Sequence, residues 1–542
     1  MSEHVIGIDV GTGSARAGVF DLQGNLKAAA TCEIDVYKDG DFAEQSSRQI
    51  WDACAQVVRQ IVAESGVNPA DVVGLSYDAT CSLVAVSTRG EALSVARDGD
   101  PAHDIILWMD HRAKDLAAEI TATKHPVLRY VGGIISPEME PPKLKWLKQN
   151  LPDTWAKTDK FLDLADFLTW KSTGNDVRSL CTCVCKWTYL GHEGRWDQTF
   201  FDQIGIGDLF EGGRVGNDVR PMGAFIGNLT NEAATHFGLT TSCAVGVGLI
   251  DAHAGGVGSM GSVFEHSPES KLDDLQSVLA LIGGTSSCHM AVSLEQHFIP
   301  GVWGPYYGAM LPGMWLAEGG QSATGALIDH VIANHALKAE LQQQAEAAGQ
   351  DVYQFLNARV AKLKEQSGRG PELTKNLHVL PYYHGNRSPR ADAYALGIVD
   401  GLSLDQSLDT VALSYYAHLQ AIAYGTRHII DEMRQAGYGI QRIHACGGGT
   451  KNPLWLQEHA DITGCDVYLP GEPEAMLLGT AVFAALAAGK FASVPAAMKA
   501  MCRAGASLPA NAATAAYHQA KYECFVDLYD QQLARRERLR AF

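Results

Sequence analysis

The sequence has little positive charge and no long apolar segment, and each absence excludes a class of protein. Lys and Arg number 43 against 61 Asp and Glu, which gives a net charge of −18. Such an acidic balance argues against a nucleic-acid or anionic-membrane partner. The most apolar helical stretch, 479–489, is too short and too rich in alanine to span a bilayer. The first ten residues have neither a basic segment nor an apolar core, so no secretory signal is predicted.

Paired cysteine spacing is also missing. Twelve cysteines are scattered along the chain, and the one cluster is Cys181, Cys183 and Cys185, in a C-x-C-x-C pattern. On a strand, that spacing points all three side chains to one face. Zinc sites usually need C-x₂₋₄-C with further partners, so we predict a structural role for the cluster and no metal site. Free thiols without a secretory signal favour a cytoplasmic location.

Two common nucleotide-binding signatures are absent as well. There is no G-x-x-x-x-G-K-[ST] and no kinase-type catalytic loop, which excludes P-loop enzymes and protein kinases. The 542 residues are enough for about two to four domains. With 46 % hydrophobic and 19 % charged residues, the composition is that of an ordinary globular protein.

What the sequence does contain is a repeated pattern. Apolar runs and turn signals predict strands over 5–10, 15–20 and 26–34, then a helix over 46–65 and a strand over 71–79. A second strand–glycine–strand hairpin is predicted over 277–293. Two hairpins with Gly-Thr at the tip suggest a duplicated α/β fold, although single hairpins of this kind are common. The polar stretch 259–275 places the division between domains 1–262 and 263–542.

Three glycine loops mark candidate phosphate sites. The first, Gly11-Thr12-Gly13-Ser14, follows Asp9, and an acid beside a phosphate loop favours a Mg²⁺–nucleotide complex; a turn-capping aspartate is the other interpretation. The second loop is Gly283-Gly284-Thr285 in the second hairpin. The third is Gly447-Gly448-Gly449, between a predicted strand and a helix from about Pro453. Glycines there let the backbone approach a ligand and point helix N–H groups at it.

Together these loops resemble the superfamily of sugar kinases, actin and heat-shock chaperones. Further stretches narrow the resemblance to the FGGY family of carbohydrate kinases. The stretch 249–258, LIDAHAGGVG, is similar to the G-x-x-D-A-x-A motif of that family, and residues 385–403 are similar to its G-x-R-[ST]-P stretch. Residues 447–464 resemble its C-terminal signature, and residues 107–113 resemble a stretch of its N-terminal domain. The resemblance runs from about residue 4 to about 490. It implies an α/β protein of two ribonuclease H-like domains with an interdomain active-site cleft.

The resemblance also implies roles for individual residues. Asp251 would be the catalytic base that accepts a proton from the sugar hydroxyl attacking the γ-phosphate of ATP, and a helix-capping aspartate is the alternative. A strong base is unnecessary because the transition state of phosphoryl transfer is loose. Asp9 and Asp251 would hold or orient Mg²⁺. The implied ATP-binding residues are Gly11, Thr12, Gly13, Ser14, Arg16, Gly284, Thr285, Gln321, Gly447, Gly448, Gly449 and Asn452.

The expected sugar is D-ribulose, phosphorylated on its terminal hydroxyl. The T-C-S-L-V stretch at 80–84 and the stretch 301–329 resemble the D-ribulokinase branch of the family. Lys186 and Glu318 match positions that hydrogen-bond the open-chain ketose, although a solvated strand end is the alternative for Lys186. Thr80, Cys81, Ser82 and Asp251 would complete the sugar site, with Cys81 packed against the sugar carbons.

Other functions remain open at this point. The same chemistry could act on L-ribulose, ribitol or D-xylulose. An actin-like ATPase without a sugar substrate and a sugar-sensing pseudokinase are more distant alternatives. The presence of Asp9, Arg16 and Asp251 argues against the pseudokinase. The expected partners are the sugar and ATP, with no nucleic acid and no membrane, and the expected assembly is a homodimer.

Overall fold

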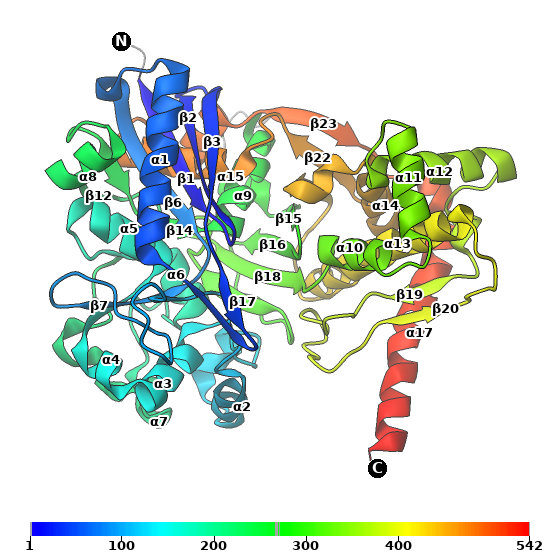
Figure 1. Ribbon diagram of the computed structural model, residues 1–542, viewed down its shortest axis with the longest axis horizontal. Coiled ribbons are helices and arrows are strands. Elements are labelled where there is room, and N and C mark those ends of the chain that lie inside the picture. The colour runs from blue at the N-terminus through cyan, green and yellow to red at the C-terminus, as the bar shows by residue number, and fades with distance from the viewer. Residues whose placement is uncertain (1–2, 266–268, 270, 541) are drawn as a thin grey trace.

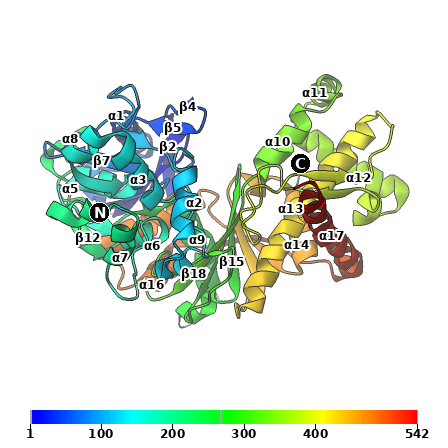
Figure 2. The ribbon, with the colours of Figure 1, turned by 90° about the horizontal axis from the view of Figure 1, so that it is seen from below.

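The computed structural model describes residues 3–265, 269, 271–540 and 542. They form two lobes side by side, each built on a mixed β-sheet with helices packed against it (Figure 1). In the view from below, β15 (Val278–Gly283) and β18 (Trp315–Gln321) of the second sheet lie near the middle of the molecule (Figure 2). The second lobe's sheet therefore faces the first lobe directly.

The first sheet has the strand order β12-β13-β6-β1-β2-β3. β1 (His4–Val10), β2 (Ser14–Asp21) and β3 (Leu26–Glu33) form an antiparallel meander, and β6 (Val72–Ala79) lies parallel to β1. The predicted strands and helix are confirmed here. Helix α1 (Ser47–Ser65) begins one residue after its predicted start because Ser46 is its N-cap, accepting a hydrogen bond from the backbone N of Gln49.

The second sheet repeats this topology. Its order is β17-β18-β16-β15-β21-β22-β23. Three strands, β18, β16 and β15, are antiparallel neighbours, and β21 and β22 continue parallel to β15, as β6 and β13 continue from β1. This confirms the predicted α/β fold of two duplicated, ribonuclease H-like units. The bounds of the strands not yet given are β12 (Phe225–Asn228), β13 (Ala244–Gly246), β16 (Ser287–Ser293), β17 (Trp303–Tyr307), β21 (Arg442–Cys446), β22 (Asp466–Pro470) and β23 (Ala504–Leu508).

The remaining elements surround these two sheets. A five-stranded sheet in the first lobe consists of β4 (Tyr37–Asp39), β5 (Phe42–Gln45), β8 (Ile105–Ile106), β7 (Leu83–Ser87) and β9 (Thr158–Asp163). The main helices are α2 (Lys114–Ala122), α3 (Glu140–Asn150), α5 (Leu164–Thr173), α10 (Gly325–Ala333), α12 (Val352–Ser367), α13 (Leu408–Gln435), α14 (Pro453–Thr463), α16 (Val494–Met501) and α17 (Ala515–Leu539). None of the helices among the described residues combines the length and apolar character that crossing a bilayer requires.

Helix α15 (Ala475–Ala487) lies in sequence between β22 and β23 of the second sheet but packs on the first sheet (Figure 1). Two glycines allow the close approach. A Cβ at Gly7 in β1 would lie 2.2 Å from the carbonyl O of Leu477, and one at Gly74 in β6 would lie 2.5 Å from that of Ala484. Helix α15 of the proposed domain 263–542 therefore covers the sheet of the proposed domain 1–262. Residues 266–268 and 270 of the boundary stretch lie outside the described residues.

The cysteine cluster lies on a helix, so the strand geometry that would put all three cysteines on one face does not apply. Cys181, Cys183 and Cys185 belong to α6 (Leu180–Lys186), and residues 181–186 are all buried. In a segment buried on every side, the alternation of residue types carries no signal of strand against helix. Helical spacing instead puts Cys181 and Cys185 one turn apart on a common face. Lys186, at the end of this helix, is buried rather than solvated.

The contact between α15 and α9 (Asp251–Met260) gives a first testable prediction. A Cβ at Gly258 would lie 1.9 Å from the backbone carbonyl O of Ala475. We expect Gly258→Ala to lower the free energy of unfolding by about 1–3 kcal/mol, because the added methyl forces two helix backbones apart. Denaturant unfolding measures the loss. Gly256→Ala is the matched control, since its Cβ would meet the flexible side chain of Met310. Equal losses in both variants would contradict this cause.

Candidate active site

Asp251 lies where the first sheet meets helix α9. The short strand β14 (Leu249–Ile250) pairs with β6 and leads directly into the helix, so Asp251 is its first residue. Its Oδ1 accepts a hydrogen bond from the backbone N of Ala252 at 2.7 Å. Burial and the nearby negative charge of Asp9 raise the pKa of Asp251 to about 6. The carboxylate is thus held at a fixed place with a proton affinity suited to accepting a proton near neutral pH.

Asp251 faces a cavity of about 270 Å³ between the lobes. Both lobes contribute to its wall. Large aromatic side chains, two cations and three acids converge there, an arrangement typical of a site for a small polar molecule. Outside the second and third glycine loops, the cavity is lined by Thr12, Thr80, Cys81, Trp108, Glu138, Lys186, Ile250, Asp251, Ala252, Ile282, Cys288, Trp303, Glu318, Arg387 and Met476.

Lys186 and Glu318 both line this cavity, one from α6 and the other from β18. Burial alone would lower the pKa of Lys186, but the negative groups around it, Glu318 among them, raise it above its usual value. Burial would raise the pKa of Glu318, but a hydrogen bond and the positive charge of His253, with Lys186, lower it. A cation and an anion are therefore presented to the same small space.

Arg387 and Glu138 complete the charged wall, and sequence reasoning assigned a role to neither. Arg387 Nη2 lies 3.4 Å from Glu138 Oε2, which makes an ion pair between the two lobes. Burial would raise the pKa of Glu138, yet Arg387 and His111 lower it to about 2. Trp303 lies near both cations, with Lys186 Nζ 4.6 Å and Arg387 Cζ 5.1 Å from its ring centre. Arg387 belongs to the 385–403 motif, which was the available signal.

The glycine loops lie beside this cavity and open into a second one. Residues Gly283, Gly284, Thr285 and Gly448 line both cavities, so the two spaces adjoin. The second cavity, of about 1,010 Å³, is in the second lobe. Its wall includes Gly449 and Asn452 from the predicted set, and also Asp329, Asp351, Tyr353, Asn357, Trp455 and other residues that the sequence did not single out. A long ligand could therefore reach from the second cavity to Asp251.

Space around the glycines suits a ligand that approaches the backbone. A Cβ on Gly13 or Gly448 would meet nothing within 4 Å, so each α-carbon faces open space. Gly447 has a φ of +89°, a conformation that favours glycine. Asn452 caps α14, because its Oδ1 accepts hydrogen bonds from the backbone N of Leu454 and Trp455. The loop and the helix start therefore lie together on the wall of the second cavity.

Some residues of the predicted set lie away from the cavity walls. Of the first loop only Thr12 lines a cavity, where its hydroxyl accepts a hydrogen bond from Trp108 Nε1 at 3.0 Å. Ser82 is fully buried and accepts one from the backbone N of Trp108. Gln321 lines neither cavity, because its amide donates to Thr426 and to the carbonyl of Ile422 inside the second lobe. Its contact with ATP stays a prediction. The other loop residues not on a wall are Gly11, Gly13 and Ser14.

Three acids gather at the ends of β1, β6 and β14. Asp9 pairs in register with Asp78, and the Asp9 carboxylate accepts a hydrogen bond from Arg16, which also contacts Glu474. The Asp78 carboxylate accepts one from Thr480 on α15, and its other oxygen has no hydrogen-bond partner among the described residues. Burial and Asp9 raise the pKa of Asp78 well above its usual value. Clustered carboxylate oxygens, one of them unsatisfied, are the donor set that Mg²⁺ prefers.

Comparisons with known proteins agree with this geometry. Models of the FGGY family of carbohydrate kinases match residues 4–258 for the N-terminal domain and 279–488 for the C-terminal domain. An FGGY carbohydrate kinase domain-containing protein of Xenopus laevis is 48 % identical, over 98 % of this chain and 96 % of the relative. A D-ribulokinase of Saccharomyces cerevisiae is 39 % identical, over 90 % and 72 %. The crystal structure of a xyloylose kinase from Brucella ovis aligns with a TM-score of 0.80 at 22 % identity, over 98 % and 100 %.

Proposed function

This chain belongs to the FGGY family of carbohydrate kinases, and we propose that it phosphorylates the terminal hydroxyl of D-ribulose with ATP, giving ADP and D-ribulose 5-phosphate. Family membership makes it an ATP-dependent phosphotransferase that acts on a sugar. The choice of D-ribulose is supported by the 39 % identity to a relative named D-ribulokinase. The observation that carries the proposal is a small charged cavity around Asp251 that adjoins a larger one along glycine loops.

Asp251 acts as the base in this proposal. A terminal hydroxyl in the smaller cavity would lie against its carboxylate, which orients the hydroxyl and accepts its proton late in the transfer. ATP would occupy the larger cavity, with its phosphates along Gly284, Thr285 and Gly448, where the two spaces meet. Water is excluded on the sugar side because the ion pair between Arg387 and Glu138 joins the lobes.

The acidic cluster fits a magnesium ion. Asp9 and Asp251 would hold it, with Asp78 beside them, and Mg²⁺ when bound supplies positive charge that balances the phosphate oxygens. In this structure Arg16 pairs with Asp9 and so neutralises part of the negative charge that would hold the ion. These residues would then position the phosphates relative to the sugar hydroxyl.

Lys186, Glu318 and Arg387 would recognise the oxygens of the sugar. A pentulose offers a carbonyl and several hydroxyls, which need both donors and acceptors. The cationic side chains can only donate, and the Glu318 carboxylate can only accept. Cys81 would pack against the sugar carbons, since burial raises the pKa of its thiol and keeps it neutral. Trp303, near both cations, would form one wall of the sugar site.

A panel of sugars tests the substrate. D-Ribulose, L-ribulose, D-xylulose and ribitol are compared in an assay that couples ADP release to a signal, and the result is read as kcat/KM ratios. We expect D-ribulose to give the highest value. A higher kcat/KM for another member of the panel would overturn the choice of sugar but leave the kinase chemistry. ATP hydrolysis that no sugar stimulates would instead favour an actin-like ATPase.

Gly448→Val tests the assignment of the nucleotide site. Its α-carbon faces open cavity, so a branched side chain would fill ligand space without disturbing the fold. We expect the Kd for ATP, measured by calorimetry, to rise about tenfold or more, which corresponds to a loss of about 1.4 kcal/mol of binding free energy. Sugar binding measured without ATP should be unchanged. An unchanged ATP affinity would mean that the triple glycine is only a turn.

Two other expectations stay predictions. We propose a homodimer, which light scattering of the purified chain would test, and a cytoplasmic location, where ATP and free thiols are both maintained. Neither is needed for the chemistry above, because one chain provides every residue that it invokes.

A further inference from the structure

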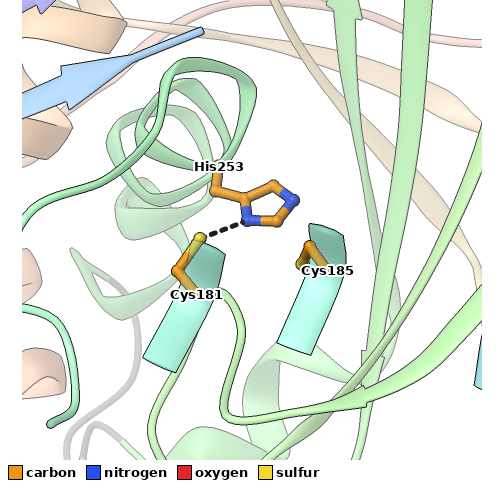
Figure 3. Close-up of side chains that lie close together, drawn as sticks. All are labelled: Cys181, Cys185 and His253. Atoms are coloured by element: carbon orange, nitrogen blue, oxygen red, sulfur yellow. Dashed lines mark hydrogen bonds between the residues drawn. The ribbon is translucent and has the colours of Figure 1, made fainter. Parts of the chain in front are cut away.

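Three side chains that the kinase chemistry does not use converge behind the sugar cavity. Cys181 and Cys185 project from the same face of α6, and His253 projects toward them from α9 (Figure 3). Their two sulfur atoms and one ring nitrogen all lie within 4.8 Å of one another. Cys181 Sγ and His253 Nδ1 are hydrogen-bonded at 3.0 Å. All three side chains are essentially inaccessible to solvent, with exposed fractions of 0 %, 1 % and 0 %.

The donor atoms and their spacing suit a thiophilic divalent cation. Zinc binds thiolate sulfur at about 2.3 Å and imidazole nitrogen at about 2.0–2.1 Å, in tetrahedral geometry. In that geometry, neighbouring ligand atoms are roughly 3.5–3.8 Å apart. The donor atoms, now all within 4.8 Å of one another, would therefore need only small side-chain movements to reach the spacing that a central ion requires. Two thiolates also neutralise the charge of the ion, which a buried site requires.

The second nitrogen of His253 has the partner that a metal-bound histidine usually has. Nε2 lies 3.3 Å from the Glu318 carboxylate. A histidine that binds a metal through one nitrogen generally donates its other N–H to a carboxylate, which fixes the ring and its tautomer. His253 would reproduce that arrangement by binding the metal through Nδ1 and donating the N–H of Nε2 to Glu318. Glu318 would then be held by the ion at one end while its side chain lines the sugar cavity.

A buried hydroxyl without a partner lies beside the cluster. Tyr306, on β17, is only 2 % exposed, and its hydroxyl has no hydrogen-bond partner among the described residues. Its strand β17 packs against α6, the helix that carries Cys185. A buried polar group without a partner usually marks a missing ligand or water. Water in the fourth position of a three-ligand ion would give Tyr306 a partner.

We propose that Cys181, Cys185 and His253 form a binding site for a single zinc-type cation, separate from the magnesium site. The two sites differ in chemistry, because sulfur and imidazole select zinc whereas the carboxylates around Asp9 select magnesium. The bound ion links α6 to α9 and, through His253 and Glu318, to the second lobe. It thereby fixes the position of Glu318. The site itself does not depend on which sugar is phosphorylated.

Metal retention by the full chain tests this site. Purified protein is incubated with excess zinc chloride and desalted, and its zinc content is measured by mass spectrometry. We expect one zinc per chain in the wild type and far less in the Cys181→Ser and Cys185→Ser variants. Cys183→Ala is the matched control. Cys183 is buried on the same helix but does not belong to the group of Cys181, Cys185 and His253, so this variant should retain zinc. Glu318→Gln should weaken zinc binding by about 10- to 100-fold.

A second measurement needs no variant and so avoids the question of folding. X-ray absorption at the zinc edge of the wild-type protein should give two sulfur ligands and one imidazole nitrogen. The proposal is overturned if the wild type retains no stoichiometric zinc after desalting, or if the shell contains no sulfur. It is also overturned if the Cys181→Ser/Cys185→Ser double variant folds and retains zinc like the wild type. Failure of the sugar panel would leave all these results unchanged.

Discussion

Asp251→Asn should lower kcat by at least about 100-fold, the usual scale of general acid–base catalysis. The amide has the same size as the carboxylate, and it can still accept the hydrogen bond from the backbone N of Ala252. It cannot accept the proton of the sugar hydroxyl. A coupled ADP assay at saturating D-ribulose and ATP measures the loss. Because Asp251 lines only the smaller cavity, the affinity for ATP measured without Mg²⁺ should change little.

Two controls separate lost chemistry from lost structure. Calorimetric binding of ATP without Mg²⁺ should be preserved in Asp251→Asn. The exposed Asp153→Asn, in a short helix that lines neither cavity, should keep full activity. If Asp251→Asn retains activity within a few-fold of the wild type, Asp251 is not the base. Asp9 would then be the next acid to examine, since its charge already influences Asp251.

Lys186→Met and Glu318→Gln should each raise the KM for D-ribulose far more than the KM for ATP. Removing one group leaves a buried polar partner unpaired, which costs about 1–3 kcal/mol, or roughly 5- to 150-fold in affinity. The loss should fall on the sugar because both side chains line the smaller cavity and neither lines the larger one. The preference among pentuloses should also flatten, because groups that hydrogen-bond hydroxyls discriminate most strongly.

Lys171→Met is a matched control for Lys186→Met. Lys171 Nζ also lies near an indole ring, 5.6 Å from that of Trp51, but on α5 and outside both cavities. Its substitution should leave both KM values unchanged. An equal rise of both KM values in the Lys186 or Glu318 variant would indicate general misfolding or failed closure of the lobes. An unchanged sugar preference in both variants would mean that the stereochemistry is recognised elsewhere, with residues 80–84 next to test.

Local features of the fold could be predicted from the sequence, because hairpins and strand–glycine–helix turns leave short-range patterns. The meander of β1 to β3 and the start of α14 at Pro453 are examples. Asp251, the first residue of α9, could be singled out for the same reason, since it directly follows an apolar strand. Each of these depends on residues within about one turn or one strand of each other.

The rest of the site could not be predicted because its residues meet only through tertiary packing. Glu138 and Arg387 are an ion pair although they come from different lobes and from irregular segments without periodicity. Gln321 is a different case: Glu318 and Thr324, three residues away on either side, line the cavities, yet the Gln321 side chain turns inward to Thr426. The helix α6 was missed because a fully buried segment has no polar face to reveal its period.

The position of α15 on the first sheet has a consequence for biosynthesis. A ribosome releases the strands β1 and β6 early, but the helix that covers them, with Leu477 against Gly7 and Ala484 against Gly74, is among the last elements made. During most of translation the first lobe therefore lacks part of its core and exposes an apolar sheet face, a state prone to aggregation. We expect incomplete chains that end before residue 475 to be held by chaperones and degraded. A cell would then not accumulate truncated chains that bind sugar without phosphorylating it.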